Sequence, residues 1–175
     1  MILFDSLPRP LTGLAGAALA LFLISSPASA QSPAEAAVGG TFAGLGGNWS
    51  GTGTITVADG GSERIRCRAT YNVGAGNMTL QQNLRCASDS YKFELQSEIT
   101  YDSGTISGSW NEASRQIYGQ LTGRATATHI QATAQTVGFT AALSLTTRGN
   151  SQSVSIKSPG SEISEVSISL ARAGR

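Results

Sequence analysis

Polar and apolar residues alternate with a period of two over most of the chain, starting near residue 47. Over residues 48–57, Trp49, Ile55 and Val57 share one face, and the other face is made of Ser and Thr. Strict alternation of this kind is typical of a β-strand that is covered on one side only. Gly- and Asp-containing segments such as 58–61 and 74–76 separate these stretches and predict tight turns.

The alternation predicts about ten short strands, and no amphipathic helix of useful length. The first six are expected at 48–57, 63–73, 77–86, 91–101, 106–110 and 115–125, and four weaker ones near 130–134, 139–145, 154–156 and 166–170. On the apolar face of the third strand Gln82 is the exception, and Ile163 is out of phase with the last strand, which predicts a bulge or a turn there.

Short connections favour antiparallel neighbours, and a long meander removes its exposed edges most simply by closing on itself. We therefore expect an all-β, antiparallel up-and-down meander of about 8–10 strands that closes into a barrel over residues 47–175. A two-sheet β-sandwich is the alternative.

The side to which the apolar face points distinguishes a barrel embedded in a membrane from a barrel with an apolar interior. A barrel embedded in an outer membrane needs an apolar outward face across the lipid band. Here the alternate face carries Ser, Thr, Arg, Gln and Glu on most strands. We expect the apolar face to point inward and the mature protein not to insert stably into a membrane.

The N-terminal segment has the features of a secretory signal peptide. Residues 11–24 form an uncharged, mostly apolar run, and the small residues of "SSPASA" follow it. This predicts a signal peptide over 1–30, cleavage near Ala30–Gln31, and export to the periplasm or the medium; an uncleaved membrane anchor is the alternative. Residues 31–46 are rich in Ala and Gly and are expected to form a flexible leader.

Charge and residue counts exclude several function classes. The 175 residues include 12 Lys and Arg against 11 Asp and Glu, and this near-neutral balance argues against nucleic-acid binding. The single histidine, His129, lies on a polar strand face, and no motif marks a nucleophile beside it. A zinc site needs about four ligands. We expect no catalytic residues, no metal and no cofactor.

Cys67 and Cys86 are the two cysteines, and both lie on the apolar faces of neighbouring strands. The turn near residues 74–76 brings them roughly opposite each other. An even pair in an exported chain predicts a disulfide inside the barrel.

Three arginines, Arg64, Arg66 and Arg68, alternate with apolar residues on the second strand. With Arg85 of the third strand they predict a basic patch on the outer wall, beside an acidic stripe that includes Glu94. This patch is interpreted as a solvated face or as a docking surface for an anion or a protein.

The inward positions carry the candidates for a ligand pocket. Five aromatic residues point to the apolar side: Trp49, Tyr71, Phe93, Trp110 and Phe139. Glycines and alanines share this face, and they serve either to bend the strands or to leave room for a ligand.

The residues "GNW" at Gly47–Trp49 open the first strand. They resemble the Gly-x-Trp signature of lipocalins and other calycin barrels. The resemblance implies a calycin-like barrel in which an arginine near the end of the last strand, here Arg172, packs across the tryptophan. The chain is also similar to periplasmic inhibitors of metalloproteases, which are small exported barrels with a Gly-x-Trp start and one disulfide.

Three functions follow as hypotheses for a non-catalytic exported barrel. It binds a small hydrophobic ligand in its interior; it binds a partner protein, as an inhibitor would, with residues 31–46 entering the partner's cleft; or it is a structural protein of the envelope. The sequence specifies neither a particular ligand or partner nor an oligomeric state.

Overall fold

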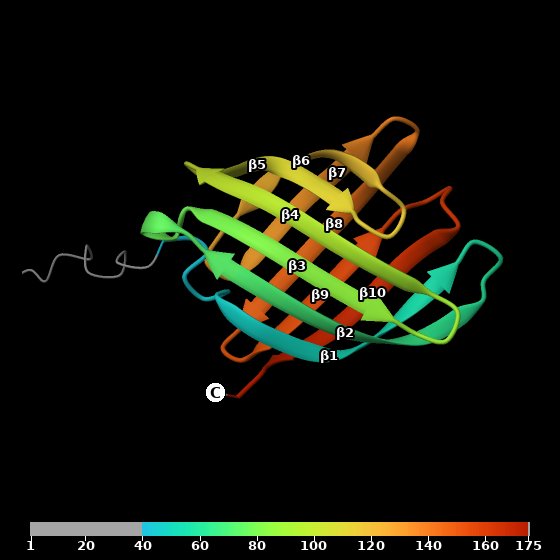
Figure 1. Ribbon diagram of the computed structural model, residues 1–175. Coiled ribbons are helices and arrows are strands. Elements are labelled where there is room, and N and C mark those ends of the chain that lie inside the picture. The colour runs from blue at the N-terminus through green and yellow to red at the C-terminus, as the bar shows by residue number, and fades with distance from the viewer. Residues whose placement is uncertain (1–39, 175) are drawn as a thin grey trace, which may run out of the picture. The chain divides into compact units, whose positions relative to one another are not determined.

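The computed structural model describes residues 40–174, and they form a closed barrel of ten antiparallel strands (Figure 1). The strands are β1 (Gly47–Val57), β2 (Ser62–Val73), β3 (Thr79–Ala87), β4 (Lys92–Asp102), β5 (Thr105–Glu112), β6 (Ile117–Ala125), β7 (His129–Thr136), β8 (Phe139–Arg148), β9 (Ser151–Lys157) and β10 (Ile163–Arg172). Each strand pairs with its neighbours in sequence, and β1 pairs with β10 to close the barrel. The expected all-β meander and its closure are confirmed.

Strand boundaries differ from the predicted ones by only a few residues. The largest differences are three residues, at the end of β8 and at the starts of β9 and β10. Strand β3 begins two residues later than predicted, at Thr79, because a short 3-10 turn, η2 (Ala75–Asn77), precedes it. Met78 follows that turn and is exposed, whereas the alternation had placed it on the inward face.

The phase change near Ile163 is a β-bulge. Ile163 faces Val57, but Glu165 faces Thr56, so that Ser164 is the extra residue. The Ser164 hydroxyl donates to the carbonyl of Thr56 at 3.0 Å, which fixes the bulged strand against β1.

The two faces of the strands have the predicted directions. The largest fully buried side chains include Ile55, Ile65, Leu84, Ile106 and Ile168, all on the inward face. The outward positions are mainly exposed Ser, Thr, Arg and Gln. Strands β2–β4 cross β7–β9 on the other side of the interior (Figure 1). No helix among residues 40–174 is long and apolar enough to cross a membrane.

One end of the barrel is closed by the segment that precedes β1. Phe42 and Leu45 are buried there, and the Phe42 N–H donates to the carbonyl of Asn77 at 3.1 Å. Residues 40–46 are therefore packed against the barrel, and the expectation of a flexible leader is wrong for this part. Burial of these two apolar side chains favours the packed position of the segment. Residues 31–39 and the predicted signal peptide lie outside the described residues.

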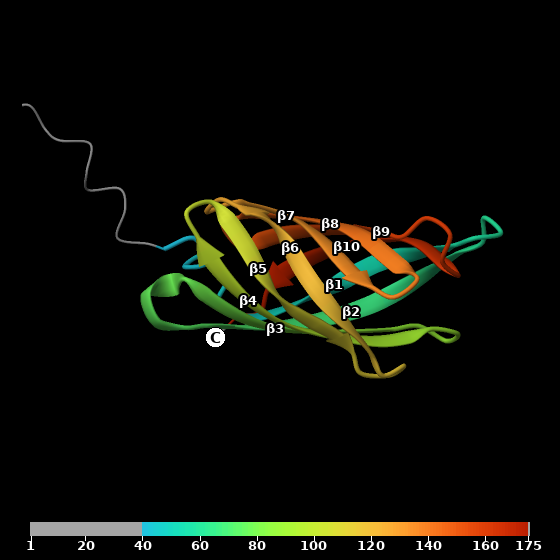
Figure 2. The ribbon, with the colours of Figure 1, turned by 90° about the horizontal axis from the view of Figure 1, so that it is seen from above.

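Arg172 fastens the closed end. Its guanidinium lies over the Trp49 ring, 4.3 Å from the centroid, and it donates to the carbonyls of Gly44, at 2.6 Å, and of Gly46. The Trp49 indole N–H donates to the carbonyl of Leu45 at 2.8 Å. The arginine–tryptophan contact that the calycin resemblance implies is thus present. The C-terminus lies at this same end (Figure 2).

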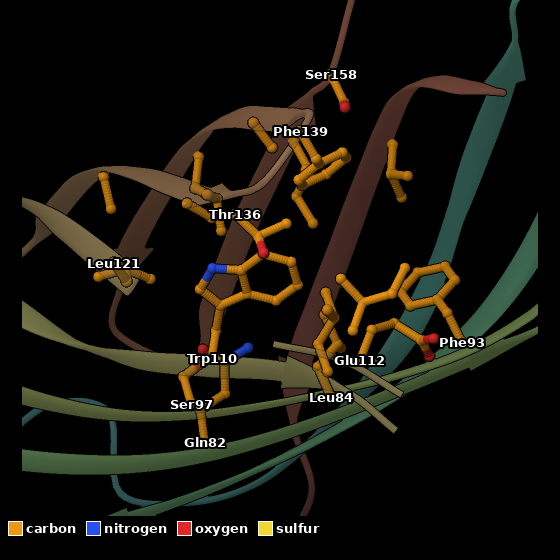
Figure 3. A pocket seen from close by; sticks show the side chains of 18 of the residues that line it. Gln82, Leu84, Phe93, Ser97, Trp110, Glu112, Leu121, Thr136, Phe139 and Ser158 are labelled. Atoms are coloured by element: carbon orange, nitrogen blue, oxygen red, sulfur yellow. The ribbon is translucent and has the colours of Figure 1, made fainter. Parts of the chain in front are cut away.

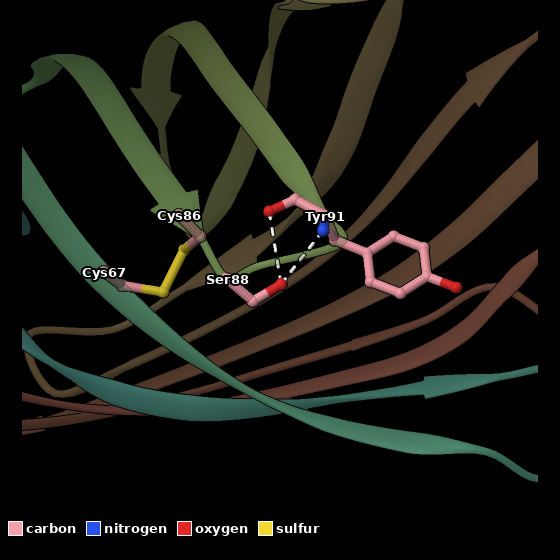
Figure 4. The surroundings of a disulfide bond; sticks show 4 residues. All are labelled: Cys67, Cys86, Ser88 and Tyr91. Atoms are coloured by element: carbon pink, nitrogen blue, oxygen red, sulfur yellow. Dashed lines mark hydrogen bonds between the residues drawn. A yellow bond between two sulfur atoms is a disulfide. The ribbon is translucent and has the colours of Figure 1, made fainter.

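The disulfide between Cys67 and Cys86 is confirmed, with 4.2 Å between the two Cα atoms (Figure 4). The two residues face each other across β2 and β3 and are buried. The turn after Cys86 is closed by Ser88, whose hydroxyl accepts from the Tyr91 N–H at 3.0 Å. The cross-link joins two strands that are already paired, so it fixes their register.

Candidate functional site

The interior contains a cavity of about 620 Å³. Its mouth lies at the end of the barrel opposite residues 40–46, because its lining includes the turns that join β5 to β6, β7 to β8 and β9 to β10. Most of the lining is aliphatic or aromatic: Leu80, Leu84, Phe93, Leu95, Ile99, Trp110, Leu121, Ile130, Phe139, Leu143, Leu145, Val154, Ile156, Ile163 and Val166. A concave apolar space of this volume is typical of a small-molecule site.

Three of the five predicted pocket aromatics line this cavity: Phe93, Trp110 and Phe139 (Figure 3). The rings of Trp110 and Phe139 are tilted against each other with 5.7 Å between centroids. The Trp110 indole N–H donates to the carbonyl of Gln120 at 3.1 Å, which leaves the ring face as a lining surface.

The other two aromatics, Trp49 and Tyr71, do not line the cavity. They pack edge to face at the closed end, 6.5 Å between centroids. The Tyr71 hydroxyl donates to the Gln152 side-chain oxygen at 2.7 Å, and the Gln152 amide donates to the Thr147 hydroxyl at 3.2 Å. Burial raises the pKa of Tyr71. Alternation assigned these residues to the inward face but could not show that Phe42 and Leu45 fill this end.

The inward glycines and alanines have separate roles. A Cβ on the glycines would meet a backbone carbonyl of the neighbouring strand at five positions: Gly51, Gly53, Gly108, Gly119 and Gly123. These glycines allow close strand approach and bending, and none of them lines the cavity. Ala132, Ala134 and Ala141 do line it, and their short side chains leave part of its volume open.

A buried carboxylate organises one side of the mouth. Glu112 is 6% exposed, and its oxygens accept backbone N–H groups of Glu94, at 2.8 Å, of Ser114, at 3.2 Å, and of Arg115, at 2.7 Å. Gln116, which has a φ of 55°, completes this turn. Because the carboxylate is bonded to the backbone, it shapes the rim instead of offering a free base to the interior.

Apolar side chains are exposed on the same rim. Ile117 is 39% exposed, Tyr118 is 69% exposed and Val137 is fully exposed, and all three belong to the lining. They extend the apolar lining of the cavity to the surface of the rim.

Two polar side chains interrupt the apolar lining on neighbouring strands. Gln82 of β3 faces Ser97 of β4, and both line the cavity beside Trp110 (Figure 3). Their inward direction follows from the strand alternation, in which Gln82 stood out as the exception among apolar residues.

The predicted basic patch is on the outer wall, away from the cavity. Arg64, Arg66 and Arg68 are exposed and make no ion pair with another residue of the described chain. Arg85 is the member of this patch that forms an ion pair: its guanidinium is 2.9 Å from the carboxylate of Glu94, directly opposite on β4.

His129 lies on the outward side of β7, half-buried, with its Nδ1 atom 2.9 Å from the Thr146 hydroxyl. Among residues 40–174, no group of three or more His, Cys, Asp or Glu side chains is placed to hold a metal ion.

Comparison with known proteins gives a structural likeness only. No protein-family model and no curated protein sequence matches the chain. Among solved structures, the barrel is similar to Rv2717c from M. tuberculosis, with a TM-score of 0.56 and 14% sequence identity, over 74% of this chain and 93% of that one. At this identity the likeness shows the fold alone, which is a barrel compatible with the calycin class.

Proposed function

We propose that this protein is a non-catalytic, exported barrel that binds a small apolar molecule in its interior. The observation that carries the proposal is the cavity of about 620 Å³, lined mainly by aliphatic and aromatic side chains and open at one end. Transfer of an apolar molecule from water into such a space is favourable by roughly 25 cal/mol per Å² of buried apolar surface.

Two further features support binding at this place. The exposed apolar residues of the rim, Ile117, Tyr118 and Val137, lead into the cavity. The opposite end is closed by Phe42, Leu45 and the Arg172–Trp49 contact, so that a ligand is enclosed on that side.

Export is supported by the disulfide, because such bonds persist mainly in oxidising compartments. The protein-binding alternative relied on residues 31–46 as an inserting segment. The described part of that segment, residues 40–46, packs against the barrel end and is not free to enter a partner's cleft.

The proposal is tested by filling the cavity. Ala134 is inward and lines the cavity, whereas Ala142, on the neighbouring strand β8, is outward and exposed. Ala134→Leu is expected to weaken binding of the neutral fluorescent probe N-phenyl-1-naphthylamine by about tenfold, since it occupies ligand space. Ala142→Leu, the same change on the outer face, should bind the probe as the wild-type protein does.

The readout is a fluorescence titration of each protein, with circular dichroism to verify that both variants are folded. Saturable binding by the wild-type protein that Ala134→Leu leaves unchanged would contradict the proposed site. Absence of saturable binding by the wild-type protein would contradict the proposed function.

A further inference from the structure

We infer that Gln82 and Ser97 form a hydrogen-bonding site inside the cavity that selects uncharged apolar ligands carrying a hydroxyl or carbonyl group. This inference rests on the proposed function and specifies the class of ligand that the cavity takes. In this arrangement the polar group of the ligand enters first and its apolar part faces the mouth.

The Gln82 and Ser97 side chains lack hydrogen-bond partners within residues 40–174. Ser97 is 9% exposed, and neither its hydroxyl nor the Gln82 amide hydrogen-bonds another side chain or the backbone within residues 40–174. No buried side-chain nitrogen or oxygen atom within residues 40–174 lacks a partner, so the unpaired polar atoms of Gln82 and Ser97 are open to the space beside them. A ligand that displaces water from such atoms without replacing its hydrogen bonds loses about 1–3 kcal/mol. The two groups are therefore suited to bond whatever occupies the cavity.

Strand pairing places the two side chains next to each other on the cavity wall. Gln82 and Ser97 face each other across β3 and β4, and Ser97 faces Trp110 across β4 and β5. They lie on the Trp110 side of the cavity, opposite Phe139 and Ser158 (Figure 3). Ser97 follows Phe93 by four residues in β4, which is about 13 Å along an extended strand, and its partner Trp110 precedes the rim residue Glu112 by two residues, so the pair lies inside the rim.

The pair offers both hydrogen-bond donors and acceptors. A serine hydroxyl donates one hydrogen bond and accepts others, and a glutamine amide offers both two donors and a carbonyl acceptor. Together they can satisfy a hydroxyl or a carbonyl oxygen, and they carry no charge.

An ionised ligand group is unfavourable beside Gln82 and Ser97. The charged residues among the lining are Glu112, Arg115 and Glu162, all at or next to the turns of the mouth. Burying a carboxylate beside neutral groups without a cation is unfavourable. A ligand that carries a carboxylate would have to place it at Arg115, with its apolar part inward.

The test uses ligands that share a chain length and differ in the polar group: 1-decanol, decane and decanoate, each competing with N-phenyl-1-naphthylamine. The variants are Ser97→Ala and Gln82→Met, which remove the hydrogen-bonding groups with little change in volume. The matched controls are Ser109→Ala and Gln81→Met, at exposed outward positions of β5 and β3.

We expect each cavity variant to bind 1-decanol about threefold to tenfold more weakly than the wild-type protein and to bind decane as the wild-type protein does. The control variants should change neither affinity. In the wild-type protein at alkaline pH, decanoate should bind more weakly than 1-decanol.

Equal changes for 1-decanol and decane in the cavity variants would overturn the inference and leave the proposed function standing. Tighter binding of decanoate than of 1-decanol, lost in Arg115→Gln, would also overturn it, in favour of an anion site at the mouth. Failure of all three ligands and the fluorescent probe to bind the wild-type protein would overturn both proposals.

Discussion

At the scale of single residues, three side chains on the outer wall of the barrel donate hydrogen bonds to one carboxylate. Glu94 accepts from Arg85 at 2.9 Å and from the side-chain amides of Asn83 and Gln96, both at 3.0 Å. The hydrogen bond from Arg85 is the main cause that lowers the pKa of Glu94 from 4.5 to about 2, and the two amides add to it. The folded barrel thus holds this carboxylate in its ionised form.

This shift predicts a specific acid dependence of stability. Because the folded-state pKa is lower than the unfolded-state value, the contribution of Glu94 is complete above pH 4.5 and is lost as the pH falls toward about 2. Glu94→Gln should therefore flatten the decrease in unfolding free energy over this range.

The measurement is urea unfolding of the wild-type protein and Glu94→Gln at pH values from about 7 down to about 2. Arg85→Gln, which removes the main cause of the shift, should also reduce the slope. A slope in Glu94→Gln equal to that of the wild-type protein would show that Glu94 titrates alike in the folded and unfolded chains.

At the scale of strands, the inward glycines let neighbouring backbones approach closely, and the inward alanines leave part of the cavity open. At Gly108 a Cβ would meet the carbonyl of Glu98 on the neighbouring strand, and at Gly119 it would meet the carbonyl of Gln135. An added Cβ would overlap these carbonyl groups, so even a methyl group must push two paired strands apart.

Gly108→Ala is accordingly expected to lower the free energy of unfolding by about 1–3 kcal/mol, in the range of an overpacked core position. Gly44→Ala is the control, because a Cβ at Gly44 meets nothing within 4 Å. The control should be neutral or slightly stabilising, since alanine restricts the unfolded chain. Urea unfolding measures both; equal stability of Gly108→Ala and Gly44→Ala would contradict the close approach.

The period-two pattern was sufficient to predict the strands and their faces, because successive side chains of a strand point to opposite faces of the sheet. It also predicted the bulge at Ser164, where Ile163 loses phase, and the pairing of Cys67 with Cys86. It could not predict what fills each end of the barrel. Trp49 and Tyr71 have the same inward phase as Trp110, yet only Trp110 lines the cavity, because Phe42 and Leu45 cover the other end.

The polar pair in the cavity had a weaker sequence signal. Gln82 interrupts an apolar face and was visible as an exception, but a single polar residue in a strand has several structural explanations. Gln82 becomes a candidate binding residue only because Ser97 lies opposite it and a cavity lies beside both. The strand pairing and the cavity depend on residues that are far apart in the sequence.

At the scale of the whole molecule, the barrel has two unlike ends. One end is closed by residues 40–46, the Arg172–Trp49 contact and the Tyr71–Gln152 hydrogen bond. The other end is open, has exposed apolar residues on its rim, and leads into a cavity of about 620 Å³. Within residues 40–174 the two tryptophans fall on opposite sides of this asymmetry: Trp49 is buried at the closed end, and Trp110 lines the cavity.

The two tryptophans allow the central claim to be tested within one molecule. The Trp110 ring lines the cavity, whereas Trp49 is 1% exposed and held at the closed end. In a heteronuclear NMR spectrum of isotope-labelled protein, saturation with N-phenyl-1-naphthylamine is predicted to shift the indole N–H resonance of Trp110 and to leave that of Trp49 in place. A Trp110 resonance that stays in place at saturation, or a shift confined to Trp49, would contradict ligand binding in the cavity.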